Sequence, residues 1–299
     1  MKKLMILCTL SLCLFQHLSL ANASKKMQVV VSILPQTYFV EQIGGNLVDV
    51  MCLLPEGGSP HIYEPTPQQM KFLSLADMYV RIKVEFENAW WNKIVAANSD
   101  ILIVDSTQNI EFIKGLSHSE HGESEAEHHG EKETAHDEQD PHIWLSPQRV
   151  KTQVENIYQG LITVDPQHRD IYKANKEAFV QSIGILDNEI KTKLANVKSR
   201  HFMVFHPVWS YFAKDYNLKQ IPIEFEGKEP SAREMVELMK MAKKKGIAVI
   251  FIQPQTSRRS ADIIAKQIGA KVKILDPLAA QWLKNMRLMM DTFLETLSQ

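Results

Sequence analysis

Three histidines and one aspartate are the residues of this sequence best suited to chemistry. His61 lies in a loop rich in glycine and proline, GGSPHIYEPTP, and His142 lies in the segment DPHIWLSP. His206 and Asp276 each follow a short apolar run and precede a proline. Three imidazoles and one carboxylate make a four-coordinate nitrogen and oxygen site of the kind suited to Zn²⁺. Because the four residues are far apart in the sequence, spacing alone cannot assemble them, and each histidine taken singly is also compatible with a surface or capping role.

Eight apolar runs rich in β-branched residues predict the strands that must position these side chains. They cover residues 28–33, 48–54, 78–84 and 101–105 in the first half, and 201–205, 219–223, 247–252 and 271–275 in the second. Helical patterns lie between them, for example over residues 67–75, 231–245 and 257–268. This alternation predicts an α/β protein of two similar lobes, each a mainly parallel four-stranded sheet with flanking helices. Ligands bind at the carboxyl ends of strands in such sheets, and His61, His206 and Asp276 lie at or just beyond such ends.

A long helical pattern in the middle of the chain separates the two halves. It begins at Asp165-Pro166, an N-cap followed by proline at the first helical position, and continues to Val197 with apolar residues at helical spacing. A helix of this length measures roughly 48 Å, more than a typical domain helix. We therefore predict an N-terminal lobe over residues 24–165 and a C-terminal lobe over residues 198–299, joined by a rigid connecting helix over residues 166–197.

The first 23 residues have the features of a cleavable signal peptide. Lys2 and Lys3 precede an apolar stretch, and the sequence Ala21-Asn22-Ala23 fits the pattern that a signal peptidase reads. A membrane anchor is the alternative, but the stretch is short and ends in this cleavage signal. We expect cleavage after Ala23 and export to the periplasm. Cys52 is then the one remaining cysteine, which we interpret as a buried strand residue, with a reactive or metal-binding thiol as the alternative.

Residues 117–141 form a low-complexity segment of unusual composition. It contains five histidines, nine acidic residues and one lysine, in a chain whose formal net charge is −1. Such a composition cannot form a packed core, so we expect a disordered surface loop. The density of imidazoles and carboxylates predicts weak, exchangeable metal capture, and a merely solvated insertion is the alternative. Nothing in the overall charge indicates nucleic acid, so we expect no nucleic-acid partner. Separately, we expect a monomer.

Four motifs, in order along the chain, resemble those of the zinc-binding receptors of high-affinity zinc ABC importers. They are the GGSPHIYEPTP segment around His61, the DPHIWLSP segment around His142, the FHPVWSYF segment around His206 and the LDPL segment around Asp276. The resemblance covers essentially the whole chain after the signal peptide, including the His-rich loop and the long helix. One such motif would be weak support, whereas four in register are strong.

The resemblance implies the role of each residue. His61, His142 and His206 correspond to metal ligands and Asp276 to a candidate fourth ligand, with Zn²⁺ held in the cleft between two lobes and delivered to a membrane permease. Manganese-selective relatives tend to have glutamate at the third position, so His206 favours zinc. One departure is Gln253, which stands where relatives often have glutamate; an amide would orient a ligand less strongly than a carboxylate.

Three other functions remain as alternatives. A manganese receptor of the same family is the nearest. A surface adhesin would require anchoring, and the missing lipobox argues against this. A zinc hydrolase would need an open coordination position and a general base. The HExxH motif is absent, because Pro65 follows the sequence His61-Ile62-Tyr63-Glu64. We therefore predict that the protein is not an enzyme.

Overall fold

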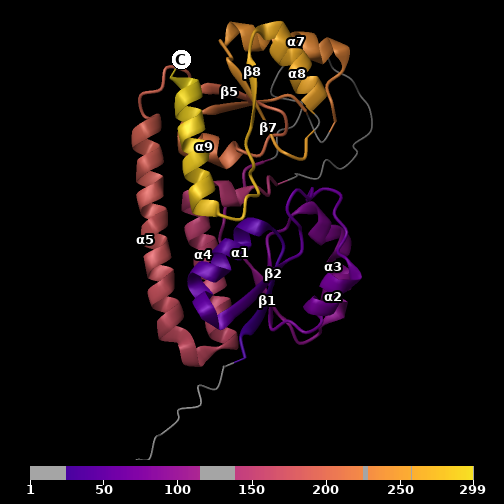
Figure 1. Ribbon diagram of the computed structural model, residues 1–299, viewed down its shortest axis with the longest axis vertical. Coiled ribbons are helices and arrows are strands. Elements are labelled where there is room, and N and C mark those ends of the chain that lie inside the picture. Colours follow the sequence, from indigo (N-terminus) through magenta and orange to yellow (C-terminus); the bar gives the residue numbers. More distant parts are fainter. Residues whose placement is uncertain (1–24, 115–138, 225–227, 257, 299) are drawn as a thin grey trace, which may run out of the picture.

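The computed structural model describes residues 25–114, 139–224, 228–256 and 258–298 (Figure 1). The predicted signal peptide and most of the His-rich segment lie outside these residues. Within them the chain folds into two lobes, each built on a four-stranded sheet, as predicted. No helix in this described part is long and apolar enough to cross a membrane.

The two sheets have the same topology. The N-terminal sheet contains β1 (Met27–Val31), β2 (Val48–Cys52), β3 (Met78–Arg81) and β4 (Leu102–Asp105), in the order β2-β1-β3-β4. The C-terminal sheet contains β5 (His201–Val204), β6 (Lys219–Pro222), β7 (Val249–Ile252) and β8 (Lys271–Ile274), in the order β6-β5-β7-β8. Every pairing is parallel. The eight predicted strands are therefore confirmed. β1 begins one residue before its predicted range and ends two residues early, and the other seven strands are one to three residues shorter than predicted.

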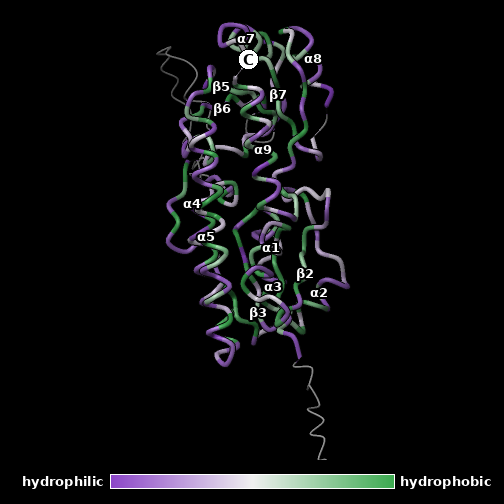
Figure 2. The backbone as a smooth tube through the Cα atoms, turned by 60° about the vertical axis from the view of Figure 1, so that its left-hand side comes forward, coloured by the Kyte–Doolittle hydropathy of each residue, from purple (hydrophilic) through white to green (hydrophobic). Residues whose placement is uncertain are grey.

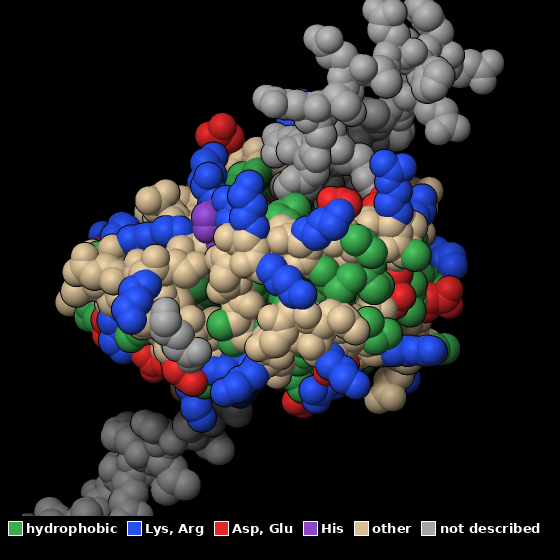
Figure 3. All heavy atoms as spheres, turned by 90° about the horizontal axis from the view of Figure 1, so that it is seen from above, with side chains coloured by type: hydrophobic (Ala, Val, Ile, Leu, Met, Phe, Trp, Pro, Cys, Tyr) green, Lys and Arg blue, Asp and Glu red, His purple; other side chains and the backbone are tan. Residues whose placement is uncertain are grey.

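The central strands are apolar on both faces because helices cover each sheet on both sides. The sequence of β7 is VIFI, and all four of its residues are buried. The short helices on the open side of the N-terminal lobe are α2 (Pro67–Leu73) and α3 (Glu85–Ala97). Helices α7 (Ala232–Lys244) and α8 (Arg258–Ile268) cover the outer face of the C-terminal sheet and present many lysines and arginines at that end of the molecule (Figure 3).

A spine of helices runs along both lobes (Figure 1). Its members are α1 (Leu34–Gly44), α4 (Pro147–Val164), α5 (Arg169–Leu194) and α9 (Trp282–Leu297). The predicted connecting helix is α5, which starts three residues late because Pro166–His168 form a 3-10 turn. It packs against α4 and α1 beside the N-terminal sheet and against α9 beside the C-terminal sheet. The link between the lobes is thus several helices thick, whereas the sequence pattern predicted one.

The helices of the spine pack closely against the N-terminal sheet. A Cβ atom at Gly160 of α4 would lie 2.4 Å from Cγ2 of Val104 and 2.8 Å from the sulfur of Met78, so only glycine allows this approach. Hydrophobic and hydrophilic residues alternate along α4 and α5, so each helix has an apolar face toward the core (Figure 2). One continuous hydrophobic cluster extends from β1 through the spine to α9, and a smaller one lies between the C-terminal sheet and α7 and α8.

Candidate metal centre

His61 is held in place by the loop between β2 and α2. Thr66 caps α2, and the hydroxyl of Tyr63 donates to the side chain of Gln69 over 2.5 Å. Gln69 in turn donates to the carbonyl oxygen of Leu53 at the end of the sheet, over 2.6 Å. The turn at Gly57 has a φ of +75°, a conformation that glycine adopts without strain. Helix signals in the sequence therefore fix the loop, while the imidazole of His61 stays 41% exposed.

His142 and His206 approach His61 from the other parts of the fold. His142 immediately precedes a 3-10 turn, Ile143–Leu145, which leads into α4, and its side chain is buried. His206 follows β5 in the C-terminal lobe and is also largely enclosed. The structure thus brings together three histidines from three separate loops, at the end of the sheets where the sequence placed His61 and His206.

The three imidazole rings are direct neighbours. The ring centroids of His61 and His206 are 4.8 Å apart and those of His142 and His206 are 5.5 Å apart. Both contacts are edge to face, with interplanar angles of 86° and 76°. Among the described residues, no group of three or more His, Cys, Asp or Glu side chains is already arranged so that it could hold a metal ion. The histidines are therefore close enough to share one ligand, but their rings must rotate to direct their nitrogens at it.

Each of the three rings has a carboxylate on its Nδ1 atom. The oxygen lies at 3.1 Å in Glu85 beside His61, at 2.7 Å in Asp140 beside His142 and at 2.5 Å in Glu224 beside His206. A carboxylate in this position favours the tautomer that carries its proton on Nδ1, which leaves the lone pair on Nε2 free for a metal. The Nε2 atom of His206 is buried and has no hydrogen-bond partner, so its lone pair is available to a metal ion.

The sequence interpretation missed these three carboxylates as parts of the site. Two signals could have identified some of them. Asp140 is two residues from His142 within DPH, and Glu224 directly follows a predicted strand end, as His206 does. Glu85 gave no such signal, since it reaches His61 only because the backbone N–H of Phe86 donates to the carbonyl of Pro60 over 3.1 Å. That bond attaches the start of α3 to the loop of His61.

The carboxylates also shape the charges of the site. The hydrogen bond and charge of Glu85 raise the pKa of His61, although partial burial acts in the opposite direction. Burial would raise the pKa of Glu85, but the contact with His61 outweighs it and holds this pKa at about 2. Burial lowers the pKa of His206 despite the nearby Glu224. The lowered pKa favours the neutral form of His206, which is the form that binds a metal.

Asp276 lies in the turn after β8, as predicted, but the structure records no contact between it and the three rings. Its Oδ1 accepts from the backbone N–H of Leu278 over 2.9 Å. Burial raises the pKa of Asp276, helped by the charge of Glu56 and opposed by the hydrogen bond from Leu278. An aspartate destabilised as an anion in this way would gain from a nearby cation. Asp276 therefore has the electrostatic character of a fourth ligand, and its role is left to the proposal below.

Two further residues bear on the site. The side-chain N–H of Gln253 lies 3.4 Å from the carbonyl oxygen of His206, a bond that an ionised glutamate could not donate. Gln253 thus supports the backbone of His206 rather than its ring. The thiol of Cys52 donates to the carbonyl of Leu54 over 3.1 Å, and burial raises its pKa to about 12. Cys52 lies in β2, as predicted, but it is half-buried rather than fully buried.

Comparison with known proteins agrees with this geometry. A family model described as "Zinc-uptake complex component A periplasmic" matches residues 29–296. The chain is 33% identical over 279 residues to the zinc-binding protein AdcA of Streptococcus pyogenes serotype M3, covering 91% of this chain and 54% of that protein. It is 30% identical over 260 residues to the high-affinity zinc uptake system protein ZnuA of Bacillus subtilis, covering 85% and 79%. The chain therefore spans about half of the length of the streptococcal relative.

The fold is similar as well. A crystal structure of ZnuA superposes with a TM-score of 0.82 at 42% sequence identity, and the match covers 91% of this chain and 99% of that one. At this similarity the two proteins share the arrangement of both lobes and of the helical spine between them.

Proposed function

Because this chain belongs to the family of periplasmic zinc-uptake components, we propose that it captures Zn²⁺ between its two lobes and delivers the ion to the permease of a zinc ABC importer. In this proposal His61, His142 and His206 bind the ion through Nε2, and Asp276 or a water molecule completes the shell. Zinc is the cargo of the protein. The signal peptide would direct export to the periplasm and would be cleaved after Ala23.

One observation carries the proposal most directly. The Nε2 atom of His206 is buried without a partner, and the rings of His61 and His142 lie on either side of His206. Leaving a buried polar atom unpaired is costly, and a bound cation would relieve that cost. With each Nδ1 held by a carboxylate, the free nitrogens have the tautomer and the added basicity that zinc ligands need.

The donor set favours zinc over manganese. Three imidazole nitrogens and one oxygen suit a four-coordinate Zn²⁺ ion, whereas Mn²⁺ prefers oxygen-rich sites of higher coordination number. The three Nδ1 partners are the only carboxylates in hydrogen-bond contact with the rings among the described residues, and all three are already engaged. Competition between the two metals for the same protein tests this selectivity.

The uneven exposure of the ligands supports a route for the ion. His142 is buried, whereas the side chains of His61 and its partner Glu85 are 41% and 45% exposed. We infer that the ion enters and leaves on the side of His61, and that release begins when Nε2 of His61 lets go of the ion while Glu85 still holds Nδ1. A permease that contacts the loop of His61 would be in the right place to start this release.

The prediction that the chain is not an enzyme is confirmed by its membership of a family of zinc-uptake components. The deciding experiment is the metal content of protein purified without a chelator, followed by calorimetric titration of the metal-free protein. We expect one tight Zn²⁺ per chain and displacement of bound Mn²⁺ by Zn²⁺. Absence of a tight site, or a tight site that prefers Mn²⁺, would contradict the proposal.

A further inference from the structure

The hydroxyl of Tyr211 connects the two segments that flank the His-rich insertion in the sequence. Tyr211 lies on α6 (Ser210–Asp215) in the C-terminal lobe and is fully buried. Its hydroxyl accepts from the backbone N–H of Ile113 over 3.0 Å and donates to the carbonyl of Asp140 over 2.7 Å. The N–H of Asp140 donates to the carbonyl of Ile113 over 3.0 Å, which closes a ring of three hydrogen bonds.

Two members of this ring, Asp140 and Tyr211, lie close in the chain to proposed metal ligands. Asp140 is two residues before His142, and its Oδ1 accepts from both the backbone N–H and the Nδ1 of that histidine, over 2.9 Å and 2.7 Å. Tyr211 is five residues after His206 in the same segment of the chain. A short path of hydrogen bonds therefore leads from the backbone that carries His206 to the ring of His142.

The side chain of Arg149 packs over the phenol ring of Tyr211 and restricts its movement. The guanidinium of Arg149 lies over it at 4.5 Å, and the same guanidinium donates to Asp215 over 2.9 Å. Asp215 also accepts from the hydroxyl of Ser146, which caps α4. With its ring stacked and both functions of its hydroxyl engaged, Tyr211 has little freedom to move relative to Asp140.

We propose that Tyr211 is a positioning residue of the zinc site, which sets the separation of His142 and His206 by holding the backbone of Asp140. This inference rests on the proposed function. His142 comes from the segment that follows the insertion and His206 from the C-terminal sheet, so their spacing depends on a contact between the two segments. Tyr211 supplies such a contact through the carbonyl of Asp140. Displacement of Asp140 would turn the ring of His142 away from His206.

A purely structural role would give Tyr211 the same hydrogen bonds, because any buried hydroxyl needs partners. The two roles differ in what they affect. A structural tyrosine contributes to the stability of the fold alone, whereas a positioning tyrosine also changes the geometry and affinity of the metal site in protein that remains folded.

Tyr211→Phe tests the proposal, with Tyr216→Phe as the matched control. Both tyrosines are buried, Tyr211 at the start of α6 and Tyr216 directly after its end, and Tyr216 donates to Asp187 of α5 over 3.0 Å, away from the histidines. We expect Tyr211→Phe to weaken the tight Zn²⁺ site about tenfold, which corresponds to about 1.4 kcal/mol. We expect Tyr216→Phe to lower the melting temperature about as much as Tyr211→Phe does, and to leave zinc affinity unchanged.

The visible spectrum of the Co²⁺-loaded protein gives a second measurement. Its ligand-field bands report the geometry around the metal, and they should shift in Tyr211→Phe and not in Tyr216→Phe. Equal affinities and identical spectra for folded Tyr211→Phe and wild type would overturn the positioning role, as would equal losses in both variants. Failure of the proposed function would be recognised separately, because the wild-type protein itself would then lack a tight site.

Discussion

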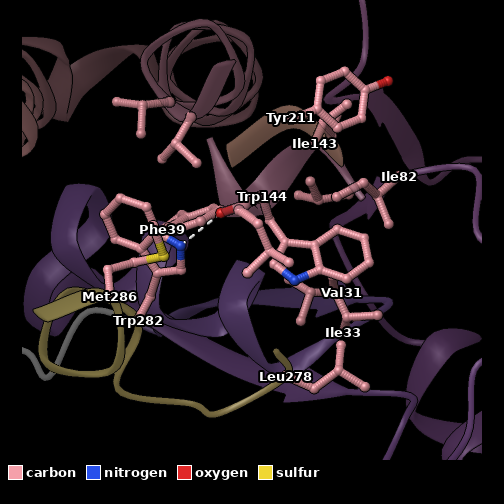
Figure 4. Packing of buried hydrophobic residues seen from close by; sticks show 14 of the residues in the cluster. Val31, Ile33, Phe39, Ile82, Ile143, Trp144, Tyr211, Leu278, Trp282 and Met286 are labelled. Atoms are coloured by element: carbon pink, nitrogen blue, oxygen red, sulfur yellow. Dashed lines mark hydrogen bonds between the residues drawn. The ribbon is translucent and has the colours of Figure 1, made fainter. Parts of the chain in front are cut away.

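The indole N–H of Trp144 donates to the carbonyl of Pro277 over 2.8 Å, which connects the segment of His142 to the turn of Asp276. The indole of Trp282, at the start of α9, donates in return to the carbonyl of Trp144 over 2.7 Å (Figure 4). Both tryptophans are buried in the cluster that joins the lobes. The segment that contains His142 and Trp144 is therefore attached to the C-terminal lobe beside Asp276, the proposed fourth ligand.

This attachment predicts a small change of shape on zinc binding. The tryptophan bonds, α5 and its packing against α1, α4 and α9 all oppose a wide hinge motion, so we expect local changes in the loops of the ligands. Small-angle scattering of the metal-free and zinc-loaded protein should give nearly equal radii of gyration. A clear decrease on adding zinc would indicate a flexible hinge and contradict the prediction.

The sequence predicted the strands better than it predicted the spine. Buried parallel strands such as β7 are continuous apolar runs, which the sequence displays directly. The packing of α9 against α5 and the contact of Glu85 with His61 join residues that are distant in the chain, and no local pattern encodes them. The histidines could be identified because each lies in a loop at a strand end or before a helix. Their carboxylate partners depend on how those loops meet, which only the fold decides.

The ligand assignment predicts the effect of alanine at each histidine. His61→Ala, His142→Ala and His206→Ala should each remove most of the tight zinc binding, because each deletes one of three nitrogen donors. Asp276→Asn should cost less if water can take its place. His201→Ala is the control, since this partly buried histidine begins β5 and has no contact with the three rings. Unchanged affinity in any of the three alanine variants would exclude that residue as a ligand.

The pair of His61 and Glu85 predicts a pH dependence. Zinc must displace any proton on His61, so affinity should fall as the pH drops through the raised pKa of this ring. The carboxylate of Glu85 stays ionised there, since its pKa is about 2. In Glu85→Gln the pKa of His61 should return toward its ordinary value, and the loss of affinity should begin at lower pH.

Chelator competition between about pH 5 and 8 measures this shift. At the upper end, where His61 is neutral in both proteins, the variant should bind zinc no more tightly than wild type, because an amide supports the ring less than a carboxylate. Identical pH profiles for the two proteins would show that Glu85 does not control the protonation of His61.

Cys52 should react slowly with alkylating reagents. Only the thiolate attacks, and burial raises the pKa of this thiol to about 12. At pH 8 the thiolate fraction is then on the order of a thousandfold smaller than for an ordinary cysteine. The rate of alkylation of the folded protein should rise about tenfold for each pH unit above 8, while urea-unfolded protein reacts quickly throughout. Rapid labelling of the folded chain at pH 8 would instead indicate an accessible, activated thiol.

Removing residues 117–138 should separate weak metal capture from the tight site. The deletion keeps Gln139, which bridges to Lys114, and Asp140, which supports His142. It removes five histidines and eight acidic residues. Binding to such a segment requires ordering it, which makes its sites weaker than a preassembled one, by at least about tenfold. Titration calorimetry should therefore show the weak sites lost and one tight site retained. The protein should stay folded, because a surface insertion tolerates shortening. Loss of the tight site in folded protein would mean that the removed segment supplies a primary ligand, and that the assignment of the three histidines is incomplete.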